Sequence, residues 1–233
     1  EEERGGFLAG ETFVDEKNDI SIFISGIDNL GASIIVQRFS STVQKIPGTI
    51  GLENQGAGIA ITQLNTSSKK DLLFFYIENI EMKDNSPTGQ NRAFLKVGYD
   101  LNFNGQPNSW SDPIQIPDWN YWENQGGDVA TADISGSNRP DVILFYMDNP
   151  SGNNKAFYRV GIDMDVKGKP TSWKKYEIPG YYGGQNQGAG VAVADLNGNG
   201  KMDLIIMYVV HENGKNKAFY RVGRDMAADG KIN

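Results

Sequence analysis

The chain lacks cysteine altogether and has a single histidine, His211, among its 233 residues. Without cysteine it can form no disulfides, no thiol nucleophile and no cysteine-based zinc site. With one histidine and no nucleophile motif, hydrolase triads and zinc catalysis are nearly excluded. A glycosidase that uses two carboxylates is still open, but no acid pair stands out from the acids that turns explain. We therefore predict that the chain is not an enzyme.

Long apolar runs and an excess of basic residues are missing too. No run approaches the roughly 18 apolar residues of a spanning helix, so we predict no membrane span. The formal charge is −7, and nucleic-acid binding needs clustered lysine and arginine, so no nucleic-acid partner is expected. The chain begins without Met and stops inside an expected turn. These ends predict a secreted or cell-surface product, or a fragment of a longer protein.

Helix-period segments are scarce, whereas 28 glycines suit many turns, and this favours an all-β fold. The most informative stretch runs from Asn186 to Tyr208. It contains two short aliphatic runs, 191–196 and 202–210, which read as strands on either side of a polar loop. In this loop, residues that can offer a side-chain oxygen or a backbone carbonyl as a ligand occupy alternate positions: Asp195, Asn197, Asn199, Lys201 and Asp203.

This spacing predicts a Ca²⁺ site, because Ca²⁺ takes about six to eight oxygen ligands and a turning loop offers one side chain at every second residue. Gly198 and Gly200 allow the necessary curvature, and Lys201 would contribute its backbone carbonyl. The alternative is a metal-free turn, since Asn and Asp favour turns in any case. With only two carboxylates the Ca²⁺ affinity should be modest.

The same stretch recurs along the chain. Gln55, Gln125 and Gln187 lie in copies of an Asn-Gln-Gly segment, and Asp71, Asp141 and Asp203 open the following apolar run, at the same spacings of 70 and then 62 residues. Copies of Lys-Ala-Phe-Tyr-Arg-Val-Gly and of Ile-Pro follow. A strand-forming repeat of this length is typical of stacked β units such as propeller blades.

The pattern V-A-x-A-D-L-N-G-N-G-x-x-D-L-I resembles the FG-GAP or VCBS-type repeat, the blade of integrin-α-like β-propellers. The resemblance covers roughly three copies and part of a fourth, residues 19–233. It implies four-stranded blades around an axis and calcium loops between the first two strands of some blades. It implies no single activity, because the family serves adhesion, lectin, toxin and enzyme-appended roles.

We accordingly predict one β-propeller domain over residues 1–233, with about four blades. Their approximate limits are 1–52, 53–122, 123–184 and 185–233. The last blade lacks a fourth strand, which residues 1–18 could supply to close the ring. The alternative is a part of a larger propeller of about seven blades, completed by a partner chain or by self-association.

The related loops in the earlier copies are weaker metal candidates. The loop from Asp133 to Asp141 replaces two ligands by Ser, and the loop from Gln63 to Asp71 keeps one carboxylate. We expect both to be metal-free, with Asp71 holding its turn through backbone hydrogen bonds. The segment 100–105 superficially resembles an EF-hand opening, but we interpret it as a hairpin loop between strands. Arg159, Arg221 and their relatives should pair with recurring acids or with backbone carbonyls.

The loops that join one repeat to the next combine aromatic residues with amides. The aromatic residues are Trp119, Tyr121, Trp122, Tyr181 and Tyr182. Rings beside amides suit sugar recognition, although the same rings could pack between blades. We therefore predict a non-catalytic, calcium-stabilised extracellular module that binds carbohydrate in the manner of a lectin. The alternative is a protein-interaction scaffold, such as an adhesion or toxin domain of a larger secreted protein.

Overall fold

The structure is a computed structural model, and not all of the chain is described. The described residues are 12–15, 20–28, 31–38, 45–48, 53–79, 82–83, 86–87, 91–102, 104–119, 124–148, 154–180, 182, 186–212 and 214–232. They contain strands and turns and no helix, so the prediction of an all-β fold is confirmed. Contacts divide the chain into two compact units, Glu1–Ile46 and Pro47–Asn233. That the whole chain forms a single domain stays a prediction.

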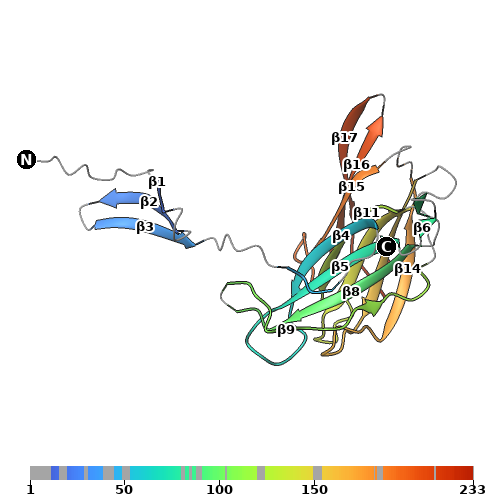
Figure 1. Ribbon diagram of the computed structural model, residues 1–233, viewed down its shortest axis with the longest axis horizontal. Helices are drawn as coiled ribbons and strands as arrows, with labels where there is room; N and C mark the ends of the chain where they lie inside the picture. The colour runs from blue at the N-terminus through green and yellow to red at the C-terminus, as the bar shows by residue number, and fades with distance from the viewer. Residues whose placement is uncertain are drawn as a thin grey trace, which may run out of the picture. The chain divides into compact units, whose positions relative to one another are not determined.

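The first unit contains one antiparallel sheet, labelled in Figure 1. Its strands are β1 (Thr12–Asp15), β2 (Ile20–Asp28) and β3 (Gly31–Arg38), in the order β1-β2-β3. Because Thr12 pairs with Phe23 and Asp15 with Ile20, β1 is the first strand of its own sheet. Residues 12–15 therefore pair within the first sheet, and the use of segment 1–18 as a fourth strand of the last repeat stays a prediction. Residues 1–11 lie outside the described part.

The second unit begins with a sheet of five strands, here called the second sheet. Its strands are β4 (Glu53–Thr62), β5 (Asp71–Asn79), β8 (Asn91–Tyr99), β9 (Ser109–Trp110) and β10 (Ile114–Gln115). The order is β10-β8-β5-β4, and β9 also pairs with β8. The short pair β6 (Met82–Lys83) and β7 (Ser86–Pro87) forms a separate hairpin between β5 and β8.

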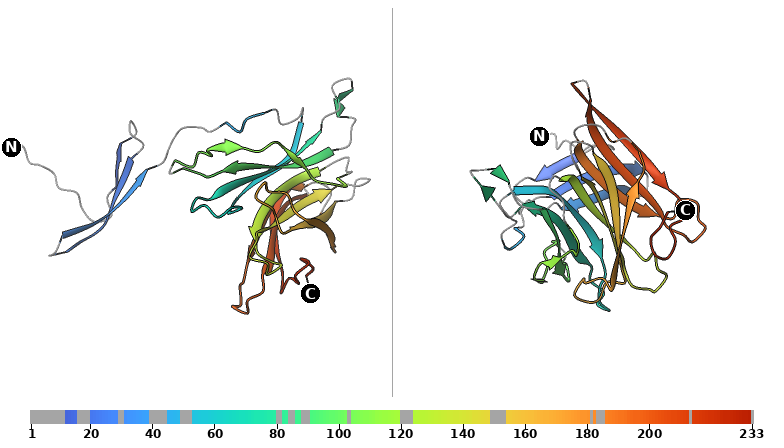
Figure 2. Two further views of the ribbon diagram at one scale, coloured as in Figure 1. Left: turned by 90° about the horizontal axis from the view of Figure 1, so that it is seen from below. Right: turned by 90° about the vertical axis from the view of Figure 1, so that its right-hand side faces the viewer.

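Two further sheets follow the same strand order. The third sheet contains β11 (Asn124–Ala132), β12 (Asp141–Asp148), β13 (Lys155–Ile162) and β14 (Ser172–Ile178). The fourth sheet contains β15 (Asn186–Ala194), β16 (Asp203–Glu212) and β17 (Lys215–Gly223). In Figures 1 and 2 the three sheets of this unit follow one another in colour order from cyan and green through yellow to red.

The first strands of these three sheets lie side by side, with β11 between β4 and β15. Thr131 Oγ1 donates to the carbonyl of Ile61, 3.0 Å away, and the Val191 N–H donates to Asp128 Oδ2 at 3.0 Å. The glycine of the Asn-Gln-Gly segment is needed here, since a Cβ on Gly56 would lie 2.6 Å from the Gly127 nitrogen. Each first strand also has a register shift within this segment.

Two hydrophobic cores separate the sheets, and the alternation of side chains along each strand explains them. Between the second and third sheets, Leu73 and Phe75 pack against Leu144 and Tyr146 in one cluster. Between the third and fourth sheets, the other face of β12 packs against residues such as Ile206. Each central strand is thus apolar on both faces, which is why its sequence is continuously aliphatic or aromatic.

Candidate functional site

The predicted calcium loop connects β15 to β16 and closes on its own backbone. Asp195 Oδ1 accepts hydrogen bonds from the N–H groups of Gly198 at 2.7 Å and Asn199 at 3.2 Å, and Oδ2 accepts one from Gly200 at 2.8 Å. These donors, Gly200 first, hold the pKa of Asp195 below its usual value. The two glycines have φ of 73° and 84°, so the tight curvature that the sequence indicated is present.

The two asparagines of the loop make similar local contacts. Asn197 Oδ1 accepts from the Asn199 N–H at 3.1 Å, and Asn199 Oδ1 accepts from the Lys201 N–H at 2.8 Å. The Asn199 side-chain amide donates to Asp225 Oδ1 at 2.7 Å, which connects the loop to the hairpin after β17. Asp195, Asn197 and Asn199 therefore place oxygen atoms at alternate positions of one exposed loop.

Asp203, which we predicted as a metal ligand, makes hydrogen bonds to two turns. Its carboxylate is buried, Oδ2 accepts from the Leu196 N–H at 3.1 Å, and Oδ1 accepts from the Asp225 N–H at 2.8 Å. Arg224 also lies 3.3 Å from Oδ2. The Asp225 N–H is the main cause that lowers the pKa of Asp203. Both oxygens are thus engaged in joining two turns.

The equivalent acids of the other sheets do the same. Asp71 accepts from the N–H groups of Leu64 at 2.8 Å and Asp100 at 2.9 Å, which confirms the predicted turn-holding role of Asp71. Asp141 accepts from Ile134 at 2.7 Å and from Asp163 at 2.6 Å. One buried carboxylate per sheet therefore ties the loop before the second strand to the hairpin after the third strand.

The residues of the loop fit a Ca²⁺ ion in part. Three oxygen-bearing side chains and the carbonyl of Lys201 have the spacing and the chemistry of calcium ligands. Asp203 is buried and bonded to the turns, and its part in a Ca²⁺ site stays a prediction. Among the described residues, no group of three or more His, Cys, Asp or Glu side chains could hold a metal. If Ca²⁺ binds, we expect Asp195, Asn197, Asn199 and the Lys201 carbonyl to hold it, and Asp203 to support them.

The loops 63–71 and 133–141, which we expect to be metal-free, also close through hydrogen bonds from backbone N–H groups to side-chain oxygens. Asp133 Oδ1 accepts from Gly136 at 2.8 Å and Ser137 at 3.1 Å, and Ser137 Oγ donates to Asp163. In the loop that starts at Gln63, Asn65 Oδ1 accepts from the Ser67 N–H at 2.7 Å, and Ser67 Oγ donates to Asp100 Oδ1 at 2.7 Å. Their lack of metal stays a prediction.

Asp100, Asp163 and Asp225 are the loop residues that sequence reasoning undervalued. Each follows the third strand of its sheet with φ near +53°, and each carboxylate receives a side-chain hydrogen bond from the loop opposite. Their recurrence at spacings of 63 and 62 residues was the available signal. The hairpin reading of segment 100–105 is confirmed by the bond from the Gly105 N–H to the Asn102 carbonyl.

Trp119 and Tyr182, two of the predicted ligand-binding aromatics, are buried between sheets. Trp119 is 3% exposed, and its ring lies 4.3 Å from that of Tyr146 and 5.1 Å from the Arg159 guanidinium. Tyr182 is 1% exposed and donates its hydroxyl to the Ile178 carbonyl at 3.0 Å. Neither ring offers a face to a sugar, so the packing alternative holds for both. Tyr121, Trp122 and Tyr181 lie outside the described residues.

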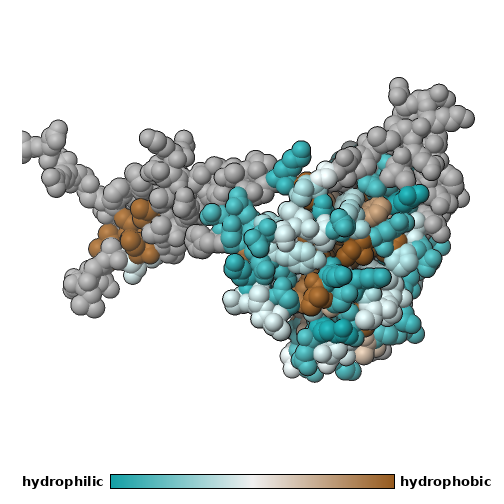
Figure 3. Space-filling view, turned by 60° about the horizontal axis from the view of Figure 1, so that its bottom comes forward, coloured by the Kyte–Doolittle hydropathy of each residue, from teal (hydrophilic) through white to brown (hydrophobic). Residues whose placement is uncertain are grey.

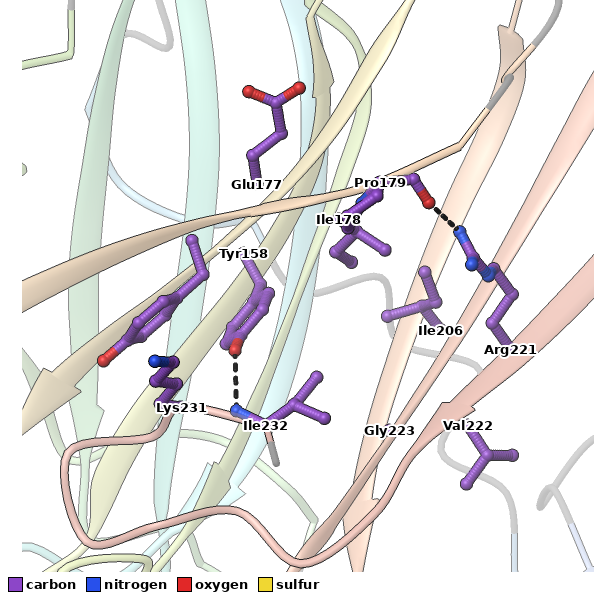
Figure 4. Close-up of a pocket in the computed structure, with 11 residues that line it drawn as sticks. Tyr158, Glu177, Ile178, Pro179, Ile206, Arg221, Val222, Gly223, Lys231 and Ile232 are labelled. Atoms are coloured by element: carbon purple, nitrogen blue, oxygen red, sulfur yellow. Dashed lines mark hydrogen bonds between the residues drawn. The ribbon is translucent and has the colours of Figure 1, made fainter.

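The recurring cations of the third strands reach backwards to the preceding repeat. Arg159 donates to the Pro117 carbonyl at 2.6 Å, Arg221 donates to the Pro179 carbonyl at 2.6 Å, and Lys96 donates to the Pro47 carbonyl. Of the two predicted partners, acids and carbonyls, these side chains take the carbonyls. The proline carbonyl and the cation therefore form a repeated contact, drawn for Arg221 and Pro179 in Figure 4, which joins the second sheet to the third and the third sheet to the fourth.

Burial and hydrogen bonding account for the remaining perturbed groups. Burial raises the pKa of Tyr76 to about 12 and that of Tyr176 to about 12. His211 is exposed, and its Nδ1 lies 2.7 Å from Asn216 Oδ1 across the β16–β17 hairpin. The His211 contact joins the two strands of this hairpin.

Comparisons with protein-family models, with curated proteins and with solved structures found no match. The resemblance to FG-GAP repeats therefore stays a prediction that rests on the residues themselves. In the described part of the chain, no helix is long and apolar enough to cross a membrane.

Proposed function

We propose that the chain is a non-catalytic binding module with the architecture of an FG-GAP-like β-propeller. The support is the repetition itself: three sheets share one strand order, their first strands are neighbours, and a hydrophobic core lies between each successive pair of sheets. A secreted or cell-surface location is part of the proposal and rests on the resemblance alone.

We further propose that another blade covers the outward face of the fourth sheet, either in a ring of about four blades or in a larger ring completed by a partner chain or self-association. On the third sheet, the equivalent face contains Phe145, which is 0% exposed because the fourth sheet packs on it. Met207 occupies the same position on the fourth sheet and is 45% exposed. A face with this apolar pattern is stabilised when a further sheet buries it.

For the ligand, the geometry favours a polypeptide over a carbohydrate. The observation that carries this choice is that Trp119 and Tyr182 are buried in cores, whereas Phe219 of the apolar strand β17 is 42% exposed. On the face in Figure 3, by contrast, hydrophilic residues cover most of the described surface and hydrophobic ones form small separate spots. An exposed apolar edge strand is a known means of binding extended peptides.

The test is a parallel screen of the whole chain against a glycan array and a displayed library of random peptides. We expect enrichment of peptides whose binding is lost in Phe219→Glu, which places a charge on the β17 edge, and kept in Val166→Glu. Val166 is also exposed, at 60%, but lies in a hairpin loop. If no peptide is enriched and the chain binds glycans in a way that Trp122→Ala abolishes, the function is that of a lectin instead.

We also propose that Ca²⁺ binds weakly at Asp195, Asn197, Asn199 and the Lys201 carbonyl. The ion would supply a positive charge that the loop oxygens share, and it would restrict the loop between β15 and β16. The support is the alternate spacing of these oxygens on one exposed turn.

A further inference from the structure

Asn-Gly occurs four times in the chain, and two of these pairs, 197–198 and 199–200, follow each other in the loop between β15 and β16. This pair of residues is prone to deamidation, because the glycine nitrogen can attack the asparagine side chain and no Cβ obstructs the approach. All four residues are exposed, and a Cβ on Gly198 or Gly200 would meet no atom within 4 Å. Both pairs therefore have the space and the water that the reaction needs.

The two glycine nitrogens are held alike, so the nucleophiles do not distinguish the pairs. The Gly198 N–H donates to Asp195 Oδ1 at 2.7 Å, and the Gly200 N–H donates to Asp195 Oδ2 at 2.8 Å. The two glycines also have similar positive φ, 73° and 84°. A difference in reactivity must therefore come from the asparagine side chains.

The Asn199 side chain is fixed at both of its polar atoms. Its Nδ2 donates to Asp225 Oδ1 at 2.7 Å, and its Oδ1 accepts from the Lys201 N–H at 2.8 Å. Asp225 is held in turn by the hydrogen bond from its own N–H to Asp203 Oδ1 at 2.8 Å. Turning the Asn199 amide towards the Gly200 nitrogen would break two hydrogen bonds, and the one with a charged acceptor is the stronger kind.

The Asn197 side chain is held more weakly. Its Oδ1 accepts one hydrogen bond, from the Asn199 N–H at 3.1 Å. Among the described residues, nothing accepts a hydrogen bond from its Nδ2. The amide can therefore turn towards the Gly198 nitrogen at the loss of one neutral hydrogen bond.

We propose that Asn197 is a site of spontaneous deamidation and that its conversion to aspartate strengthens the calcium loop. The Gly198 nitrogen bonds to Cγ of Asn197 and loses its proton, the Cγ–Nδ2 bond breaks, and Nδ2 leaves with that proton as ammonia. Water then opens the succinimide ring, at Cγ to give aspartate or at the backbone carbonyl carbon to give isoaspartate. Water is the only co-reactant.

The aspartate product has a carboxylate at a ligand position of the loop. It lies two residues after Asp195, at the alternate spacing of the proposed calcium ligands, and the affinity for Ca²⁺ rises with the number of charged ligands. Isoaspartate lengthens the backbone by one carbon atom, so only the aspartate product keeps the spacing. This half of the inference rests on the proposed Ca²⁺ binding, whereas the deamidation does not.

The test for the modification incubates the whole chain in warm, mildly alkaline buffer without Ca²⁺ and follows each asparagine by peptide mapping with tandem mass spectrometry. We expect Asn197 to deamidate about tenfold faster than Asn199, the effect of one hydrogen bond to a charged acceptor. In denaturant the two rates should be similar, because both residues precede glycine. Asp225→Gly tolerates the positive φ and removes the acceptor, so it should bring Asn199 close to the rate of Asn197. The matched variant Asp163→Gly, in the third sheet, should leave both rates unchanged.

Isothermal titration calorimetry tests the effect on calcium. Asn197→Asp should bind Ca²⁺ about tenfold more tightly than the unmodified chain, because it adds a charged ligand. Leu196→Asp is the control, since it adds the same charge to the loop between two ligand positions. We expect it to gain less affinity than Asn197→Asp.

Equal rates at Asn197 and Asn199 in the folded chain would overturn the modification site, and so would an Asn197 that stays intact while the unfolded chain reacts. The calcium half is overturned when Asn197→Asp binds Ca²⁺ no more tightly than an unmodified chain that does bind it. If neither chain binds Ca²⁺, the proposed calcium site itself fails, and the two deamidation rates still decide the modification.

Discussion

At the scale of single residues, the aspartate that begins the second strand of each of these three sheets holds two turns together. Asp71, Asp141 and Asp203 are each 0% exposed, and their carboxylates accept hydrogen bonds from N–H groups of the two flanking turns. Asp141 also accepts from Ser135 Oγ at 3.5 Å, and Asp203 lies 3.3 Å from Arg224. A buried carboxylate is tolerated when hydrogen bonds satisfy it. Replacing it leaves those backbone donors without an acceptor.

Asp203→Asn should therefore lower the Tm at neutral pH, and the deficit should shrink in acid. The pKa of Asp203 is lowered in the folded state by the Asp225 N–H, so ionisation stabilises the fold above the unfolded pKa of about 3.9. This contribution disappears as the pH falls through the lower, folded pKa. Thermal melts between about pH 7 and pH 2 measure it.

The exposed acid Asp112 gives a matched control, because Asp112→Asn changes the charge equally. We expect that variant to melt close to the unmodified chain at every pH. A deficit for Asp203→Asn that stays constant down to the lowest pH would show that the ionised carboxylate is not what stabilises the turns.

At the scale of elements, the three loops before the second strands have one design and different side chains. Asp195, Asp133 and Asn65 each accept backbone N–H groups two to five residues later. Because the loop closes in all three, its shape does not depend on a full set of calcium ligands. Calcium would add to a turn that is already formed.

Calcium should raise the Tm of the unmodified chain, and a chelator should reverse the increase. In Asp195→Ala this calcium-dependent increase should vanish, although the basal Tm also falls because three backbone N–H groups lose their acceptor. Differential scanning calorimetry with and without Ca²⁺ separates the two effects. Asp133→Ala should keep the increase, and an unchanged Tm of the unmodified chain with and without Ca²⁺ would refute the site.

At the scale of the whole molecule, one apolar face of the second unit has no described sheet packed on it. It is the outward face of the fourth sheet, where Met207 and Tyr220 replace the buried Phe145 and Tyr158 of the third sheet. The side chains are apolar in both, and only the presence of a following sheet differs. If a further sheet packs on this one, as we propose, the face is buried in solution.

Met207→Glu tests this continuation. Burial of the face predicts a destabilisation of about 2 kcal/mol or more, because the charge would be taken into an apolar interface, which corresponds to a Tm decrease of about 4–8 °C for a chain of this size. Val166→Glu, at an exposed loop residue, should stay close to the unmodified chain. Equal Tm values for the two variants would mean that the face remains open to water.

Much of the fold could be predicted from the sequence because each repeat consists of local sequence patterns that specify strands and turns. The aliphatic run after Asp203 became β16, and the polar loop before it became a turn with two glycines at positive φ. The first strands were harder to place: β15 begins at Asn186, not Val191, since Asn-Gln-Gly continues the strand through a register shift. Such a strand is hard to recognise in the sequence, because glycine has no side chain to show the alternation of apolar and polar residues.

The candidate site was less predictable, and the physical reason is competition for the same groups. An aromatic residue beside amides suits a sugar as well as a wedge between sheets, and only the packing of Trp119 against Tyr146 decides which it is. An aspartate at a calcium spacing is equally suited to hold backbone N–H groups, and only the turn after β17 shows that Asp203 does so.

The sequence by itself determined the strand class, the period of the repeat and the turn chemistry, because these depend on side-chain alternation and on the φ that glycine and aspartate tolerate. The tertiary structure alone decided which face of each strand is buried. Two identical heptapeptides, 155–161 and 217–223, have different exposures because burial depends on which strand and which sheet lie alongside, and that neighbour is not encoded in the seven residues themselves.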